Sequence, residues 1–152
     1  MTSFEKTVVV SFSQKQMYEL VADVASYPDF LPWCHRVDIL ESHDQSKLVR
    51  IGLQHKPPLQ LSLTTLATFD PDNSLQLKLT EGSFLSAFEG EWRFSPLPGD
   101  QQHPEHCRIV FTVRYRFANV LLKMALAPFF SMVVHMLPTL FIHRAREIYL
   151  SS

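Results

Sequence analysis

Polar and apolar residues alternate along most of the chain between residues 37 and 117, a period of two that is typical of strands with one face on a core. The connections between these stretches are mostly short polar turns, such as Asp70–Asn73, which leave no room for crossover helices. The pattern therefore predicts an antiparallel meander, preceded by one more strand near the N-terminus. The predicted strands are Phe4–Phe12, Val37–Ile39, Val49–Leu53, Leu59–Leu63, Leu75–Leu79, Phe84–Phe94 and Cys107–Phe117.

A helical period follows the first predicted strand. Ser13, with Gln16 three residues later, is a capping-box signature, and Pro28 disfavours helix at Tyr27, where we expect the helix to end. The next segment, Tyr27–Cys34, is dense in prolines and aromatics, so we interpret it as a rigid apolar lid or a membrane-facing tip. The apolar stripe of the helix is formed by Met17, Leu20, Val21 and Val24.

The longest apolar stretch runs from Asn119 to Tyr149. Between Val120 and Ile142, 17 of 23 residues are apolar, which is typical of a membrane anchor or of a buried core helix. The predicted strands have one apolar face and only one other clear helix to cover it, so we favour the core helix. Pro128 and Pro138 are expected to kink this helix.

These elements predict an α+β fold in which a curved antiparallel sheet of about seven strands wraps around a long C-terminal helix, with residues 1–152 forming one domain. A twisted sheet curves around a helix more readily than it packs flush against it, and Gly90 allows a close approach or a bend. We therefore expect an apolar cavity between the sheet and the helix, with Tyr27–Trp33 as its lid.

Charge and cysteine content limit the classes of function. The chain has 14 basic and 15 acidic residues, so no global field attracts nucleic acid or anionic lipid, and any charged patch is local. DNA is not expected as a partner. Cys34 and Cys107 are the two cysteines, and no signal peptide is evident, so we expect reduced thiols in a cytoplasmic protein. If the Tyr27–Cys34 segment is a membrane-facing tip, the protein also contacts the inner membrane peripherally.

Three motifs resemble a known family: Tyr27–Cys34 (YPDFLPWC), Glu81–Phe84 before Trp92–Phe94, and Arg144–Tyr149. They are similar to the coenzyme-Q-binding START family of polyketide cyclase/dehydrase-like proteins, which have a helix-grip (START/Bet v1-like) fold. The nearest branch is the bacterial RatA type. The resemblance implies a bound ubiquinone or related lipid and a role in respiration. The branch also implies a toxin-like protein that binds the large ribosomal subunit and blocks subunit association.

The predicted cavity wall is almost entirely apolar and contains no carboxylate pair for acid–base catalysis, so we expect a binding protein with no cofactor besides the bound lipid. A polyketide-cyclase-like enzyme is a further alternative. Tyr115 and His135 are the candidate polar groups for a ligand oxygen. The predicted ligand-binding residues are Phe30, Leu31, Trp33, Phe88, Trp92, Phe111, Val113, Tyr115, Phe130, Val134 and His135.

Two other groups of residues suggest chemistry. Cys34–His35 and His106–Cys107 resemble metal ligands, but strand alternation sends His106 and Cys107 to opposite faces, so we expect no metal. The outward face of the last strand carries arginines that are typical of a solvated surface and that also fit ribosomal RNA phosphates. These predicted RNA-binding residues are Arg93, Arg108, Arg114 and Arg116.

Overall fold

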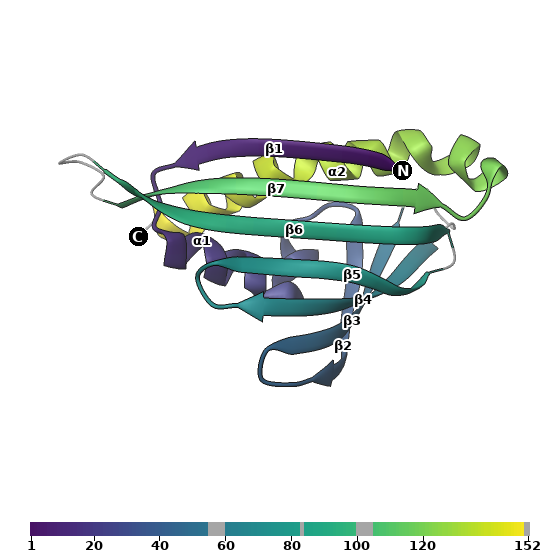
Figure 1. Ribbon diagram of the computed structural model, residues 1–152, viewed down its shortest axis with the longest axis horizontal. Coiled ribbons are helices and arrows are strands. Elements are labelled where there is room, and N and C mark those ends of the chain that lie inside the picture. The colour runs from purple at the N-terminus through teal and green to yellow at the C-terminus, as the bar shows by residue number, and fades with distance from the viewer. Residues whose placement is uncertain (55–59, 83, 100–104, 151–152) are drawn as a thin grey trace.

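The computed structural model describes residues 1–54, 60–82, 84–99 and 105–150. Seven antiparallel strands form one sheet in the order β1-β7-β6-β5-β4-β3-β2, with the N-terminal strand added beside the last one (Figure 1). The predicted α+β class and the meander are confirmed. The elements are β1 (Thr2–Val10), α1 (Gln14–Ala22), η1 (Val24–Asp29), β2 (Cys34–Ser42), β3 (Ser46–Gln54), β4 (Gln60–Asp70), β5 (Ser74–Gly82), β6 (Leu85–Pro98), β7 (Glu105–Phe117) and α2 (Val120–Tyr149).

The alternation predicted for the strands is clearest in β7. Cys107, Ile109, Phe111, Val113, Tyr115 and Phe117 are buried, whereas Arg108, Arg114 and Arg116 between them are exposed. Register shifts interrupt β2, the pairing of β4 with β5, and the start of β6, and irregularities of this kind bend and twist a sheet. The sheet consequently curves and leaves a concave apolar face. Leu59, which we expected to begin the fourth strand, lies outside the described residues.

The N-terminal helix begins as predicted but ends earlier. The Ser13 hydroxyl accepts from the Gln16 amide, and the Gln16 side chain accepts from the Ser13 amide, so both halves of the capping box are present. The expected end at Tyr27 was wrong, because the α-helix stops at Ala22 and the chain continues as the 3-10 helix η1 with Pro28 inside it. The tighter turn brings the Tyr27 hydroxyl to the Val21 carbonyl, to which it donates.

The long helix α2 covers the concave face of the sheet, as predicted. It is continuous across Pro128 and Pro138, and the side chain of Asn119 caps its first turn by accepting from the Leu122 amide at 2.9 Å. At its other end, the Tyr149 hydroxyl donates to the Gln16 carbonyl at 2.8 Å, which ties α2 to α1. The buried face consists of Leu126, Phe129, Phe130, Val133, Val134, Pro138, Phe141 and Ala145.

By length and composition, α2 alone among the described helices is long and apolar enough to cross a membrane, yet only 28% of its most apolar 18-residue stretch is buried. One side of α2 thus belongs to the core of the domain. The opposite side is apolar and open to solvent.

Candidate ligand-binding pocket

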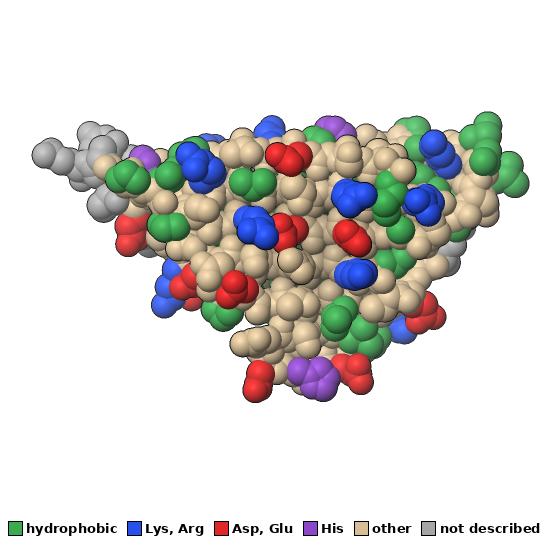
Figure 2. All heavy atoms as spheres, viewed as in Figure 1, with side chains coloured by type: hydrophobic (Ala, Val, Ile, Leu, Met, Phe, Trp, Pro, Cys, Tyr) green, Lys and Arg blue, Asp and Glu red, His purple; other side chains and the backbone are tan. Residues whose placement is uncertain are grey.

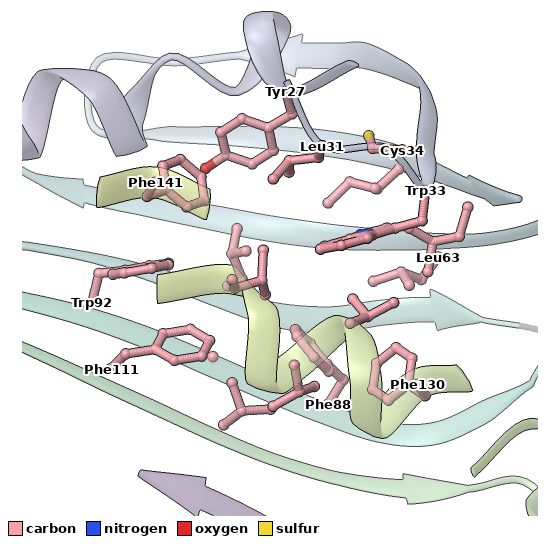
Figure 3. A pocket seen from close by; sticks show the side chains of 18 residues that line it. Tyr27, Leu31, Trp33, Cys34, Leu63, Phe88, Trp92, Phe111, Phe130 and Phe141 are labelled. Carbon is pink, nitrogen blue, oxygen red and sulfur yellow. The ribbon is translucent and has the colours of Figure 1, made fainter. Parts of the chain in front are cut away.

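An apolar pocket lies where the sheet, α2 and the Tyr27–Cys34 segment, which begins within η1, meet. In Figure 3 the side chains of Tyr27, Leu31 and Trp33 extend from this segment toward those of Phe141, Trp92 and Phe130. The pocket is therefore enclosed by elements far apart in sequence. Its wall consists of Tyr27, Leu31, Trp33, Cys34, Ile51, Leu53, Leu63, Leu77, Phe88, Gly90, Trp92, Phe111, Val113, Phe130, Val133, Val134, Leu137 and Phe141.

Aromatic contacts hold one end of the pocket together. The ring of Trp92 lies 4.3 Å from that of Phe111 and 5.1 Å from that of Phe141, measured between centroids. Tyr27 meets the same Phe141 ring edge-on at 5.3 Å. Such contacts contribute about 0.5–1.5 kcal/mol each beyond the area they bury. Phe141 thus joins the sheet, the long helix and η1 at a single point.

The empty space in the pocket is small, about 80 Å³. An apolar cavity of about 150 Å³ is known to accept benzene. A ligand with a ring and a tail therefore cannot enter this closed arrangement unless a wall moves outward. The walls that do not belong to the sheet are α2 and the Tyr27–Cys34 segment.

The pocket offers burial and no evident acid–base chemistry. Among the described residues that line it there is no carboxylate, histidine, lysine or arginine. Burial raises the pKa of the Cys34 thiol to about 11, against a weaker opposing effect of its contact with the Arg36 carbonyl. Burial also raises the pKa of Tyr27 far above its usual range. Both groups stay protonated at neutral pH, so neither supplies a nucleophile or a base.

Eight predicted residues line this pocket. They come from three regions that the sequence pattern had assigned separately, namely the lid segment, the sheet and the long helix. These residues are Leu31, Trp33, Phe88, Trp92, Phe111, Val113, Phe130 and Val134.

Two predicted aromatic residues, the half-buried Phe30 and the buried Tyr115, are outside the pocket wall. Phe30 packs on the outer side of Phe141, with ring centroids 5.1 Å apart, and the Arg144 guanidinium lies over its ring at 5.3 Å. Tyr115 is buried beyond the pocket, because the Phe130 ring, 4.8 Å from it, is the one that lines the wall. We predicted both as lining residues, and neither side chain lines the closed pocket.

His135 was the other predicted polar group, and this prediction was also wrong. Val134 faces the pocket, and the next residue on a helix is turned by about 100°, which places His135 on the solvent side. Its Nδ1 donates to the Ser131 carbonyl at 2.7 Å, and its ring packs 4.2 Å from that of Phe4. Tyr115 also lies outside the wall, so neither of the two polar side chains predicted to contact a ligand oxygen lines the pocket.

The remaining lining residues were missed by the sequence reasoning. Val133, Leu137 and Phe141 were detectable, because they follow Phe130 and Val134 at the three- and four-residue spacing of one helix face. The strand residues were recognised as inward-facing, but alternation does not tell how deep along a strand the pocket lies. Tyr27 was assigned to the lid segment but was not named as a ligand-binding residue. The others missed are Cys34, Ile51, Leu53, Leu63, Leu77 and Gly90.

The lid segment is built into the core. Tyr27, Leu31 and Trp33 are buried and face the pocket, so the segment closes one side of it, as the lid interpretation expected. Because these three side chains face the pocket, the lid interpretation is favoured over that of a membrane-facing tip.

The predicted arginine surface lies on the outward, solvent side of the sheet. Arg93 on β6 is adjacent to β7, opposite Val110, and shares the face of Arg114. Carboxylates interrupt this surface: Glu91 pairs with Arg93 at 2.6 Å, and Glu89 lies opposite Arg114 (Figure 2). The surface is therefore a mixed-charge face with a basic excess along β7. Within the described ranges, no three His, Cys, Asp or Glu side chains come together as a metal site.

Comparison with known proteins identifies the family. Residues 10–141 match the family described as "Polyketide cyclase / dehydrase and lipid transport". The chain belongs to this family. Among solved structures, the ZhuI aromatase/cyclase from Streptomyces sp. R1128 superposes on this chain with a TM-score of 0.82, covering 99% of this chain and 98% of that one, at 19% identity. At that identity the likeness shows the fold alone.

Two relatives cover nearly all of this chain and carry different names. The ribosome association toxin RatA of Escherichia coli K12 is 33% identical over 149 residues, which are 98% of this chain and 90% of that protein. The mitochondrial coenzyme Q-binding protein COQ10 homolog B of Xenopus laevis is 28% identical over 146 residues, 96% of this chain and 59% of that protein. Within the family, the chain therefore resembles both a ribosome-associated and a quinone-binding member.

Proposed function

We propose that this protein binds an apolar small molecule in the pocket between the sheet and α2 and does not transform it. The observation that carries the proposal is the composition of the wall, whose 18 residues include no side chain charged at neutral pH. A site of this kind gains free energy by removing hydrocarbon from water and has no group poised for proton transfer. The cyclase function of some family members is not favoured, for the same reason.

The ligand that we propose is an isoprenoid quinone such as ubiquinone, which would link the protein to respiration. The resemblance to the coenzyme Q-binding relative supports this class. Burial gains about 25 cal/mol per Å² of apolar surface, so micromolar affinity needs on the order of 300–400 Å² before the costs of association, which a few isoprene units supply. In this proposal the ring enters under the lid segment beside Trp33, and the tail lies between Val113 and Phe130, which also line the pocket.

Organic extraction of the purified protein followed by mass spectrometry tests this function directly, and we expect an isoprenoid lipid near one per chain. A titration with short-chain quinone should quench tryptophan fluorescence, since Trp33 and Trp92 are the two tryptophans and both line the pocket. The quenching should saturate at one ligand per chain. Linear, unsaturable quenching together with a lipid-free extract would contradict the proposal and would mean that the pocket is part of the hydrophobic core and binds no ligand.

A second candidate function is association with the large ribosomal subunit. The 33% identity to the ribosome association toxin along almost the whole chain favours it. The contact that we propose is between phosphates and the exposed arginines of β7. It uses the convex side of the sheet, so it is compatible with a ligand on the concave side.

Changing Arg108, Arg114 and Arg116 to Glu tests the second candidate. We expect the triple variant to lose co-sedimentation with the large subunit, and binding of the unmodified protein to weaken steeply with salt, because each phosphate contact releases counterions. Arg36, which is exposed and paired with Asp38 on β2, provides the control as Arg36→Glu. If the triple variant still co-sediments with the large subunit, these arginines only face solvent and do not bind ribosomal RNA.

A further inference from the structure

The half-buried side chain of Arg144, on the last turns of α2, contains a polar atom without a hydrogen-bond partner. Its Nε is shielded from solvent and donates to no acceptor in the described part of the chain. Arg144 also forms no ion pair with a carboxylate among the described residues. A buried donor that no acceptor satisfies reduces stability, so its presence here calls for an explanation.

The guanidinium of Arg144 faces an aromatic ring of the lid segment. Its central carbon lies 5.3 Å from the centroid of the Phe30 ring. Phe30 in turn packs edge-on against Phe141, with the ring centroids 5.1 Å apart. An aromatic face attracts a cation but is a weaker hydrogen-bond acceptor than an oxygen atom. The Phe30 ring therefore occupies a position beside a donor that an oxygen would satisfy better.

Arg144 continues the face of α2 that lines the pocket. Phe130, Val134, Leu137 and Phe141 belong to the wall, and Arg144 follows Phe141 by three residues, which is the spacing of one helix face. The guanidinium thus lies about one turn beyond the last lining residue of α2. A ligand whose tail fills the pocket can reach it by passing the Phe141 ring.

A quinone needs a polar contact that the pocket wall provides poorly. Its ring carries two carbonyl oxygens, and burying them without a hydrogen bond is unfavourable. None of the described residues in the wall is charged at neutral pH, and Tyr115 and His135 do not line it. A charged donor forms a stronger hydrogen bond to a carbonyl than a neutral donor does. Arg144 supplies such a donor at the edge of the pocket.

From these observations we propose that Arg144 binds a carbonyl oxygen on the ring of the ligand, and that the Phe30 ring occupies this subsite when no ligand is bound. The ligand is that of the function proposed above, on which this assignment rests. Phe30 is only half-buried, so rotation of its side chain toward solvent frees the subsite. The ligand ring, which enters under the lid segment, then packs on Phe141, and the Arg144 Nε donates to its oxygen.

A purely structural role for Arg144 has different consequences. In that role the cation holds Phe30, and with it the lid segment, against α2, so its loss destabilises the free protein. In the binding role the unpaired Nε destabilises the free protein, and the ligand oxygen removes that effect. An unpaired buried donor costs more than a partly exposed cation–π contact gains. The two roles therefore differ in sign without any ligand present.

Urea unfolding of the ligand-free protein separates the two roles. Arg144→Met keeps an unbranched apolar side chain against Phe30 and removes the donor, so we expect the urea midpoint to stay the same or to rise. Arg146→Met, at the exposed position two residues later, is the matched control. A clear fall of the midpoint in Arg144→Met and not in Arg146→Met would overturn the proposal, because it would show a structural contact.

Calorimetric titration with two probes tests the contact with oxygen. The probes are a short-chain quinone and an oxygen-free analogue that carries the same tail on a benzene ring. Arg144→Met should weaken quinone binding by about tenfold or more, because a hydrogen bond from a charged donor is lost, and should leave binding of the analogue within about twofold. Arg146→Met should change neither affinity.

Failure of this subsite differs from failure of the proposed function. If Arg144→Met weakens both probes equally, or neither, the subsite is wrong, whereas the parent's binding of quinone still supports the function. If the parent binds neither probe, the function and the subsite are both wrong.

Removal of the Phe30 side chain provides a readout of opposite sign. A group that occupies the subsite competes with the ligand, so Phe30→Ala should strengthen quinone binding several-fold, whereas loss of a wall residue would weaken it. The infrared carbonyl stretch of bound quinone should lie at lower frequency in the parent than in Arg144→Met, since a hydrogen bond weakens the C=O bond. Weaker quinone binding by Phe30→Ala, or the same carbonyl frequency in parent and Arg144→Met, would overturn the proposal.

Discussion

Trp92 on β6 and Phe141 on α2 meet with their ring centroids 5.1 Å apart and their planes at 68°. This edge-to-face contact joins the sheet to the long helix across the pocket. Tyr27 adds η1 to the same cluster through its own contact with Phe141. The stability of the domain and the shape of the pocket therefore depend on the same side chains. Substitutions at chosen positions can separate the effect on stability from the effect on ligand binding.

Removal of the Phe141 ring should be costly. Phe141 is almost fully buried, and Phe→Ala changes of this kind reduce the free energy of unfolding by about 3–5 kcal/mol. We expect Phe141→Ala to shift the urea midpoint accordingly and to enlarge the pocket. Phe30→Ala, which removes a half-buried ring on the outer side, should cost clearly less. Equal losses for the two variants would contradict the central position of Phe141.

Filling the pocket without unfolding the protein is possible at Gly90. A Cβ there meets Phe88 at 3.5 Å and Val113 at 4.0 Å, which is ordinary contact. We expect Gly90→Ala to fold normally and to bind quinone several-fold more weakly in the fluorescence titration. Gly52→Ala is the control, because its Cβ would press on the exposed His35 ring at 2.7 Å, outside the pocket wall. Unchanged affinity of Gly90→Ala would place the ligand elsewhere.

Trp33 belongs to the segment that closes the pocket, so its removal should act on access. We expect Trp33→Ala to accelerate both loading and release of a short-chain quinone, with a smaller change in affinity, as measured by stopped-flow quenching of Trp92. Leu137→Ala removes pocket wall on α2 and should mainly change affinity through lost burial. If Trp33→Ala leaves the loading rate at the parent's value and changes affinity only through faster release, Trp33 is a wall residue and not part of a lid.

Alkaline pH should destabilise the fold through its two cysteines. Burial raises the pKa of both Cys34 and Cys107 to about 11, so the folded state holds these protons more tightly than the unfolded state. The resulting stability is complete below the unfolded pKa, near 9, and is lost as pH rises toward 11. Two pKa units correspond to roughly 2–3 kcal/mol for each thiol.

Urea unfolding between pH 8 and pH 10 checks this dependence. Cys34→Ala with Cys107→Ala should be less stable at pH 8 but should lose less stability over this interval than the parent does. If the free energy of unfolding falls equally with pH in both proteins, the alkaline loss of stability comes from other groups, such as Tyr27, whose pKa is also raised by burial.

Short-range patterns determined the elements of this protein. The period of two in β7, the Ser13–Gln16 capping box and the apolar stretch after Asn119 each depend on neighbouring residues, so the sequence alone predicted strands, helix start and covering helix. Six pocket residues followed from the same patterns, because inward-facing positions on sheet and helix converge wherever the two are packed. Leu31 and Trp33 followed from the density of prolines and aromatics in the Tyr27–Cys34 segment. The family resemblance pointed to the same fold.

The tertiary structure decided what no local pattern contains. Val113 lines the pocket and Tyr115 does not, because the Phe130 ring of α2 packs against Tyr115 and lines the wall in its place. His135 faces solvent because the sheet covers the opposite face of α2. The same packing left Leu121 and Met124 uncovered, since the sheet ends before α2 does. Burial of an apolar residue is a property of the surfaces that meet, and those surfaces come from segments far apart in the chain.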